Sequence, residues 1–191
     1  MFNRISLSAI AFVVALAVLT LLSPVPSMAA GKAKIDRDAR VALEKLYKDN
    51  MMAQTLAEKA KGILIFPGII KGGFIVGGQY GEGALLKNGT TVGYYSTAAA
   101  SYGLQAGIQD FGYAMFFMTD KALEYLDKSS GWEIGVGPSL VIVDKETAAA
   151  FGKTTTTSTV QSDIYAFVFS QKGLMAGLGL QGSKITKINP K

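Results

Sequence analysis

The chain of 191 residues contains 22 glycines, no cysteine and no histidine, and it carries a formal net charge of +5. Without cysteine and histidine it has no thiol nucleophile, no imidazole base, no disulfide and no ordinary zinc, copper or haem ligand set. Triads built on Ser, His and Asp, or pairs of Cys and His, are excluded, so we expect neither an enzyme nor a bound metal or cofactor.

The first 29 residues have the pattern of a signal peptide. Arg4 supplies a positive charge, and an almost unbroken apolar run follows from Ile10 to Leu22. Two prolines then break the helix, and the small residues around Ala29 suit signal peptidase, which predicts cleavage near Ala29. We expect an exported protein of the periplasm or cell envelope, in which residues 30–191 form one domain. An uncleaved N-terminal anchor is the alternative.

Two amphipathic helices are predicted at the start of this domain. Asp36 can cap the first helix, and apolar residues then recur at helical spacing from Val41 to Tyr47. The second helix is expected over Met51–Lys61, and both helices would cover a sheet. Basic residues precede the first helix or lie on it: Lys32, Lys34, Arg37 and Arg40. A basic amphipathic helix suits an anionic lipid interface, although a solvated helix face gives the same pattern.

The segment from 62 to 118 predicts glycine-rich strands. Gly62–Pro67 is a short apolar run typical of a buried strand, and Asn88-Gly89 is a hairpin turn signal between two alternating segments. We expect an antiparallel meander of four or five strands here. Glycine at alternate positions favours a strongly curved antiparallel sheet, a half-open barrel, packed with the N-terminal helices and short connecting helices. The predicted fold class is therefore α+β.

The rest of the chain predicts one helix and three further strands. Thr119-Asp120 can cap a helix over Lys121–Lys128. Strands are expected over 133–143, where Pro138 marks an edge or a bulge, and over 164–170 and 174–188. A helical turn over 145–151 and a Thr-rich loop or exposed strand over 153–162 are expected between them.

Motifs for catalysis and nucleotide binding find little support. Gly177 to Gly182 spells the dinucleotide fingerprint, but a strand-like pattern follows where a helix is required. Gly152-Lys153-Thr154 resembles the end of a P-loop, whose first glycine would fall on Thr147. The basic residues are dispersed, so nucleic-acid binding is not expected. Carboxylates near the strands leave a carboxylate-based hydrolase open: Glu82, Asp110, Glu133, Asp144 and Asp163.

Several glycine-containing blocks together resemble one known family. These blocks are Gly62–Pro67, Lys71–Phe74, Val76–Gly78, Ser101–Gly107, Gly135–Pro138, Asp163–Phe167 and Ser170–Leu174. From about Ala42 to Ile188 the chain resembles the SYLF domain family, and its signal pattern makes it similar to the stand-alone exported bacterial members. The resemblance implies a lipid-binding domain with a lipid-contacting amphipathic N-terminal helix. It also implies the phosphoinositide and actin binding of eukaryotic members, which carry SH3 or FYVE modules.

We therefore expect a non-enzymatic protein that binds lipid or a membrane surface, with residues 30–191 as a SYLF-like lipid-binding domain. Anionic phospholipid head groups are the expected partner, and actin binding is implied by the resemblance. The expected lipid-binding residues are Lys32, Lys34, Arg37, Arg40 and Lys71. A small outer-membrane β-barrel is the alternative that the length, the predicted export and the glycine-rich strands leave open.

Overall fold

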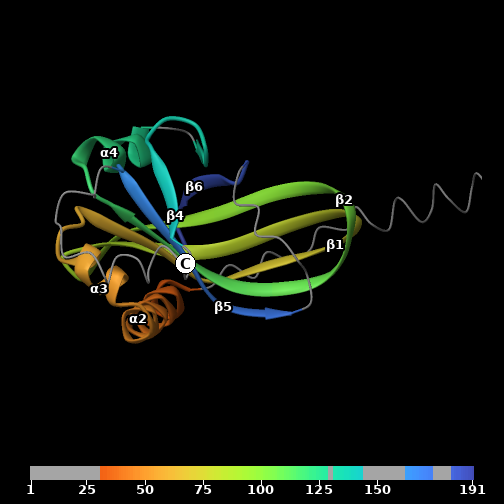
Figure 1. Ribbon diagram of the computed structural model, residues 1–191, viewed down its shortest axis with the longest axis horizontal. Coiled ribbons are helices and arrows are strands. Elements are labelled where there is room, and N and C mark those ends of the chain that lie inside the picture. Colours follow the sequence, from red (N-terminus) through yellow and green to blue (C-terminus); the bar gives the residue numbers. More distant parts are fainter. Residues whose placement is uncertain (1–30, 129–130, 144–161, 174–181) are drawn as a thin grey trace, which may run out of the picture.

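A computed structural model describes residues 31–128, 131–143, 162–173 and 182–191 (Figure 1). The described helices are α2 (Lys32–Asp49), α3 (Met51–Ala57) and α4 (Asp120–Lys128). The described strands are β1 (Gly62–Lys87), β2 (Thr90–Phe117), β3 (Trp132–Glu133), β4 (Leu140–Val143), β5 (Ile164–Gly173) and β6 (Lys184–Ile188). The predicted signal peptide, the expected turn over 145–151 and most of the expected segment over 153–162 lie outside the described residues.

The centre of the fold is one long hairpin made of β1 and β2. The two strands pair in antiparallel fashion from Gly62 opposite Phe117 to Lys87 opposite Thr90. The turn between them is the predicted one, because Asn88 and Gly89 both have positive φ, at 50° and 74°, as a tight hairpin turn requires. The expected meander of four or five strands is wrong. Irregularities in the pairing replace the expected breaks, and the strands continue through them.

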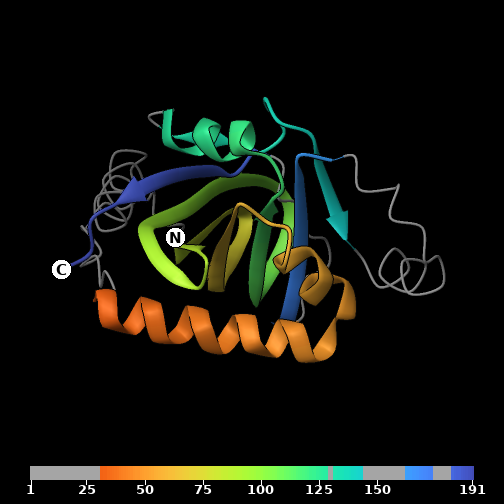
Figure 2. The same cartoon turned by 90° about the vertical axis from the view of Figure 1, so that its left-hand side faces the viewer.

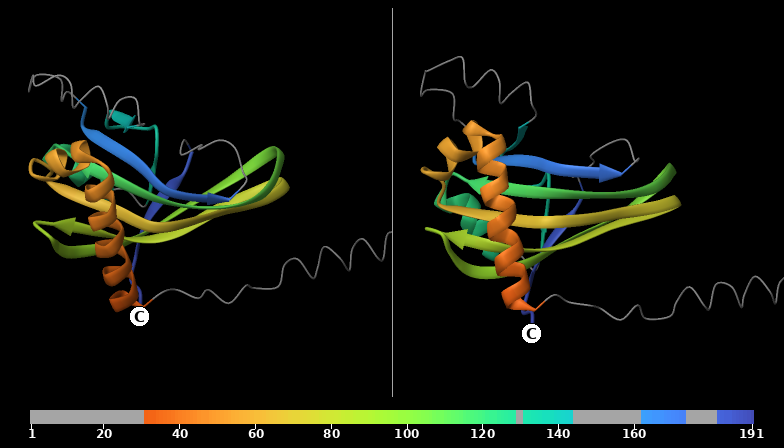
Figure 3. Two further views of the ribbon diagram at one scale, coloured as in Figure 1. Left: turned by 60° about the horizontal axis from the view of Figure 1, so that its bottom comes forward. Right: turned by 90° about the horizontal axis from the view of Figure 1, so that it is seen from below.

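Glycines allow β1 to fold back on itself. A side-chain carbon at Gly83 would overlap the carbonyl oxygen of Ile65, and one at Gly81 would lie 2.8 Å from the carbonyl oxygen of Gly68. The two halves of β1 therefore pack backbone against backbone, which only glycine permits. β2 follows the same bend, and the hairpin curls as Figures 1 and 3 show.

The remaining strands extend the curled sheet on both sides. β5 pairs with residues 109–117 of β2 and β6 pairs with residues 94–98, while β4 and β3 form the outer strands. This arrangement confirms the predicted α+β fold with a strongly curved, glycine-rich sheet. One detail differs from the expectation, because β4 and β5 run parallel and the sheet is mixed.

Helices cover the sheet on opposite faces (Figure 2). Alternate residues of β1 serve each face: Leu64 and Phe66 pack in the core cluster that contains α4, whereas Ile63 and Ile65 pack in the cluster that contains α2 and α3. This is the side-chain alternation of a strand that is buried on both sides. We refer to the two sides as the α4 face and the α2 face.

Side chains at the helix starts define where the helices begin. α2 starts at Lys32 with no side-chain cap, so the prediction that Asp36 caps it is wrong. Asn50 caps α3 by accepting a 3.1 Å hydrogen bond from the amide of Ala53. The hydroxyl of Thr119 accepts one of 3.2 Å from the amide of Ala122 and caps α4, as predicted. Within the described part of the chain, no helix has the length and apolar character needed to cross a bilayer.

Candidate functional site

Helix α2 lies across the strands (Figure 3). Its inner side is an apolar stripe at helical spacing, formed by Ile35, Ala39, Ala42, Leu43 and Leu46, all of which are buried. The four predicted basic residues of α2 are all exposed. The structure therefore brings Lys32, Lys34, Arg37 and Arg40 together on one element, as the sequence analysis expected.

Two carboxylates of α2 are occupied by contacts within the protein. Asp36 turns toward β2, where it accepts hydrogen bonds from the hydroxyls of Thr91 at 2.8 Å and Tyr94 at 3.0 Å. These bonds join α2 to the hairpin. Asp36 does not cap the helix because α2 begins four residues earlier, at Lys32. Burial and the neighbouring Asp36 carboxylate raise the pKa of Tyr94, so this hydroxyl remains a hydrogen-bond donor at neutral pH.

The second carboxylate, Asp38, neutralises part of the predicted basic set. Lys34 Nζ lies 2.6 Å from Asp38 Oδ2, and the Arg37 guanidinium lies 3.1 Å from Asp38 Oδ1. The hydrogen bond from Lys34 is the largest of the effects that lower the pKa of Asp38. Both basic side chains remain more than 60% exposed, so these pairs contribute little to stability.

Four other cations of α2 have no such partner. Among the described residues, the side chains of Lys32, Arg40, Lys45 and Lys48 form no hydrogen bond or ion pair. All four are exposed. They are the positive charges of α2 that are available to an external anion.

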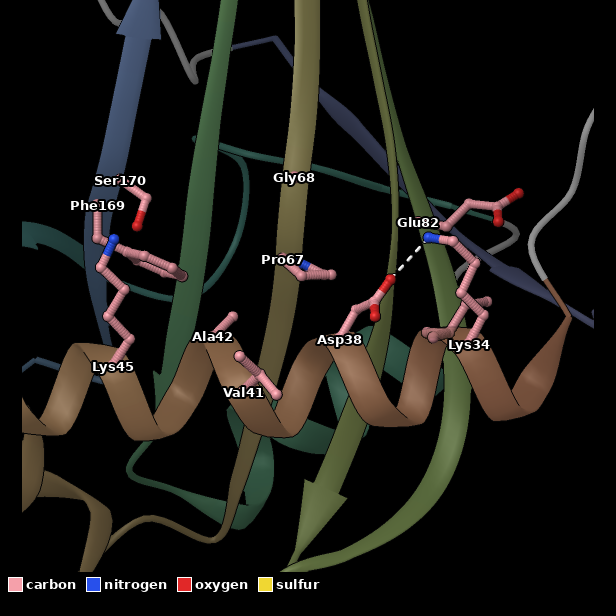
Figure 4. Close-up of a pocket in the computed structure, with 11 residues that line it drawn as sticks. Lys34, Asp38, Val41, Ala42, Lys45, Pro67, Gly68, Glu82, Phe169 and Ser170 are labelled. Carbon is pink, nitrogen blue, oxygen red and sulfur yellow. Dashed lines mark hydrogen bonds and ion pairs between the residues drawn. The ribbon is translucent and has the colours of Figure 1, made fainter.

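An open groove of about 450 Å³ lies between α2 and the sheet (Figure 4). Lys34, Asp38, Val41 and Lys45 line it from the helix, each about one turn from the next. Pro67 and Glu82 of β1 and Phe169 of β5 line it from the sheet. The groove thus combines an apolar floor with charged groups along its rim.

Glu82, the acidic residue that the sheet contributes to this groove, also has a hydrogen-bond partner. The hydroxyl of Tyr80 donates a 2.8 Å hydrogen bond to Glu82 Oε1. Partial burial and the Glu82 carboxylate raise the pKa of Tyr80 to about 12, so the phenol keeps its proton at neutral pH. Lys45 is consequently the cation of the groove that has no partner among the described residues.

A second hollow of about 580 Å³ lies at the other side of the start of α2. Lys32 borders it together with residues 91–94 of β2 and Lys187 and Ile188 at the end of β6. Lys32 and Lys34 therefore border different hollows, although they are only two residues apart. The basic surface of α2 extends around the helix and is not confined to one pocket.

Lys71, the fifth predicted lipid-binding residue, lies elsewhere. It is in β1 opposite Gln109, is only 8% exposed and takes part in an interaction within the protein. It borders neither of the two hollows. The structure does not bring Lys71 together with the cations of α2.

The described carboxylates considered for a hydrolase come from different segments of the chain: Glu82, Asp110, Glu133 and Asp163. Asp163 accepts hydrogen bonds from the hydroxyls of Ser139 at 2.8 Å and Thr119 at 3.1 Å, and the bond from Ser139 is the main cause of its lowered pKa. A lowered pKa makes a carboxyl a poor general acid at neutral pH. Glu133 pairs with Lys184 in the sheet register, and Asp144 lies outside the described residues. The described residues hold no cluster of three potential metal ligands.

Helix α2 thus lies over a curled sheet with an open hollow on each side of it. Residues 98–190, just under half of the chain, match the Ysc84 family, which is described as "Las17-binding protein actin regulator". The match confirms, over residues 98–190, the resemblance to the SYLF family. No curated protein matches the chain.

The matched region contains only part of the candidate site, including Phe169 of the groove and Lys187 and Ile188 of the second hollow. The match begins within β2 and continues through β6, whereas α2 and β1 precede it. Sequence reasoning did not identify Lys45 or Val41 as site residues. The spacing of Lys34, Asp38, Val41 and Lys45 was a usable signal, because residues three or four apart share one side of a helix.

Proposed function

We propose that the protein binds anionic phospholipid surfaces through the basic side of α2 and catalyses no reaction. The observation that carries this proposal is the set of four exposed cations without a partner among the described residues, Lys32, Arg40, Lys45 and Lys48, on a helix whose inner side is fixed to the sheet. A basic residue near an anionic membrane surface contributes about 1 kcal/mol to binding. Four such residues are enough for reversible surface attachment.

Sedimentation with vesicles tests this proposal. The protein is purified from cells that express the full chain and mixed with vesicles of phosphatidylcholine alone or with phosphatidylglycerol added. Binding should require the anionic lipid. The double variant Arg40→Glu/Lys45→Glu should bind at least roughly 30-fold more weakly, because the loss of two attractive charges of about 1 kcal/mol each alone gives this factor and the two added carboxylates are repelled as well.

A matched control distinguishes the effect of the charges on α2 from the effect of the net charge of the protein. Lys45→Glu alone is compared with Lys121→Glu, which changes the net charge equally at an exposed position of α4, away from α2. Lys121→Glu should bind nearly as well as the wild type. Reversal at Lys34 and Arg37 should have a smaller effect than reversal at Arg40 and Lys45, because Asp38 already neutralises part of their charge. Equal recovery with neutral and anionic vesicles would refute the proposal.

The proposed place of action is the cell envelope. The support is the pattern of residues 1–29, which is typical of a signal peptide cleaved near Ala29. Fractionation of expressing cells should recover the protein with the periplasm or membranes, and its mass should correspond to a chain that starts at residue 30. Recovery of the uncleaved chain from the cytoplasm would contradict this part of the proposal.

Actin binding is a second candidate function, favoured by the description of the matched family. Its test is co-sedimentation with filamentous actin in the absence of lipid. Pelleting of the wild type with actin, unchanged in Arg40→Glu/Lys45→Glu, would favour a site in the matched residues 98–190 over a site on α2.

A further inference from the structure

The β1–β2 hairpin extends well beyond α2 and carries exposed apolar side chains. We call residues 70–80 of β1 and 98–110 of β2 the arm, which forms the free end of the curled sheet in Figures 1 and 3. On the arm Ile70 is 64% exposed, Ile108 is 71% exposed, Val76 is 64% exposed and Tyr80 is 49% exposed. Several large apolar side chains exposed close together are unusual on the surface of a soluble protein.

Strand alternation places these four residues on the α2 face. Lys71 and Gln79 are buried on the opposite side, and their neighbours in β1, Ile70 and Tyr80, are exposed. In β2, Ile108 lies opposite Gly72 and therefore shares the face of Ile70. The exposed group is thus one surface and not a set of scattered residues.

This surface continues from the groove beside α2. Gly68 and Glu82 line the groove. Ile70 lies two residues beyond Gly68 toward the end of the arm, and Tyr80 lies two residues before Glu82. Because side chains two residues apart share a strand face, the apolar surface begins where the charged rim of the groove ends.

The arm is also almost free of charge. Lys71 and Asp110 are the only ionisable Asp, Glu, Lys or Arg residues in 70–80 and 98–110. Lys71 is buried on the other face. Asp110 is exposed and lies opposite Ile70 of β1 and Lys172 of β5 in the sheet register, so it is the one Asp, Glu, Lys or Arg residue of the arm that shares the face of Ile70. Cations without a partner among the described residues, such as Lys45, gather instead on α2 at the base of the arm. The positive charge and the apolar surface therefore lie in series along one face.

We propose that the arm inserts its apolar side chains into the acyl region of an anionic bilayer, while α2 contacts the phosphates. This inference rests on the proposed function, and the order of charge and apolar surface matches the order of head groups and acyl chains. A second copy of the chain is a less suitable partner for this surface. Its four exposed apolar side chains would bury on the order of 100 Å² each, and together this is well below the ~800 Å² that each partner buries in a stable protein interface.

A fluorescent label on the arm tests insertion directly. The chain has no cysteine, so Ile108→Cys carries the only site for a thiol-reactive, environment-sensitive dye such as NBD. With anionic vesicles the emission should shift to the blue, and lipids that bear a quencher on the acyl chain should quench it. The same dye on Lys121→Cys, an exposed position of α4, should keep its aqueous emission.

A second variant measures the contribution of the arm to affinity. Ile70→Ser/Ile108→Ser should fold normally, because both side chains are mostly exposed, and thermal unfolding checks this. We expect at least about tenfold weaker binding to anionic vesicles, since apolar transfer out of water is lost.

The outcomes separate this inference from the proposed function. If the wild type binds anionic vesicles but the dye on Ile108→Cys stays in water and the double serine variant binds normally, insertion of the arm is refuted and surface binding by α2 stands. If no vesicle binds, both ideas fail. A dye response that depends on protein concentration and needs no vesicles would identify a second copy as the occupant and would also overturn the inference.

Discussion

Gly83 is the residue on which the fold-back of β1 depends most directly. A methyl group there would overlap the carbonyl oxygen of Ile65, so Gly83→Ala must push apart two halves of one strand. We expect a loss of about 1–3 kcal/mol in the free energy of unfolding. Gly78→Ala is the matched control, because its nearest contact would be an ordinary 3.5 Å to the oxygen of Ala99. Equal midpoints in urea for the two variants would contradict this role of Gly83.

Asp163 connects three segments and makes stability depend on pH. Ser139 and Thr119 stabilise its ionised form by hydrogen bonding and lower its pKa below the normal value of 3.8. A lowered pKa in the folded state stabilises the fold above pH 3.8, and this contribution is lost as the pH falls further. Asp163→Asn should therefore cost about 1–2 kcal/mol at pH 7.

The pH dependence of this difference is the decisive measurement. The gap in unfolding free energy between wild type and Asp163→Asn should shrink as the pH falls below 3.8, because the wild-type carboxyl is then protonated as well. Glu133→Gln serves as the control on an exposed carboxyl. A gap that stays constant from neutral pH down to the acid range below 3.8 would show that the hydrogen bonds do not depend on the charge of Asp163.

At the scale of elements, α2 needs a fixed inner side in order to present its cations. Leu46 is 3% exposed in the core cluster of the α2 face, whereas Val41 on the same helix is 61% exposed. Leu46→Ala should cost about 2–4 kcal/mol, and Val41→Ala should change stability by less than about 0.5 kcal/mol. Thermal unfolding of both variants checks this. Similar losses for both would mean that α2 is not anchored through this stripe.

The elements that the sequence predicted well are those with local signals. Asn88-Gly89 specified the hairpin turn and Thr119 specified the start of α4, because each acts on its own neighbours. The predicted number of strands between residues 62 and 118 was wrong for a related reason. Pro67 and the glycines are breakers in local statistics, but the register with β2 absorbs them as irregularities within one strand.

The parts that could not be predicted depend on contacts between distant residues. Asp36 looked like a helix cap because its partners, Thr91 and Tyr94, are more than fifty positions away. Lys71 looked accessible beside two glycines, yet the face on which it lies depends on the curl of the whole hairpin. The four predicted basic residues of α2 lie exposed on this helix, and their part in lipid binding stays a prediction. Their division into paired and unpaired cations required the structure.

At the scale of the whole molecule, the two proposed contacts differ in their dependence on salt. Attraction between the cations of α2 and an anionic bilayer is screened, since the Debye length falls from about 10 Å at 0.1 M to about 3 Å at 1 M ionic strength. Insertion of the apolar arm is not screened. Binding of the wild type to anionic vesicles should therefore weaken with added NaCl but level off above zero.

Two variants show which contact produces the salt-dependent part of the binding and which produces the part that remains at high salt. Arg40→Glu/Lys45→Glu should lose the salt-dependent part and keep the weak remainder, whereas Ile70→Ser/Ile108→Ser should keep the salt dependence and lose the remainder. Vesicle sedimentation across a salt series measures both. The arrangement of charge and apolar surface along one face requires that the two losses be separable, because the residues lie on different elements. If either variant abolished binding at every salt concentration, the two contacts would have to act as one, and the division between α2 and the arm would be wrong.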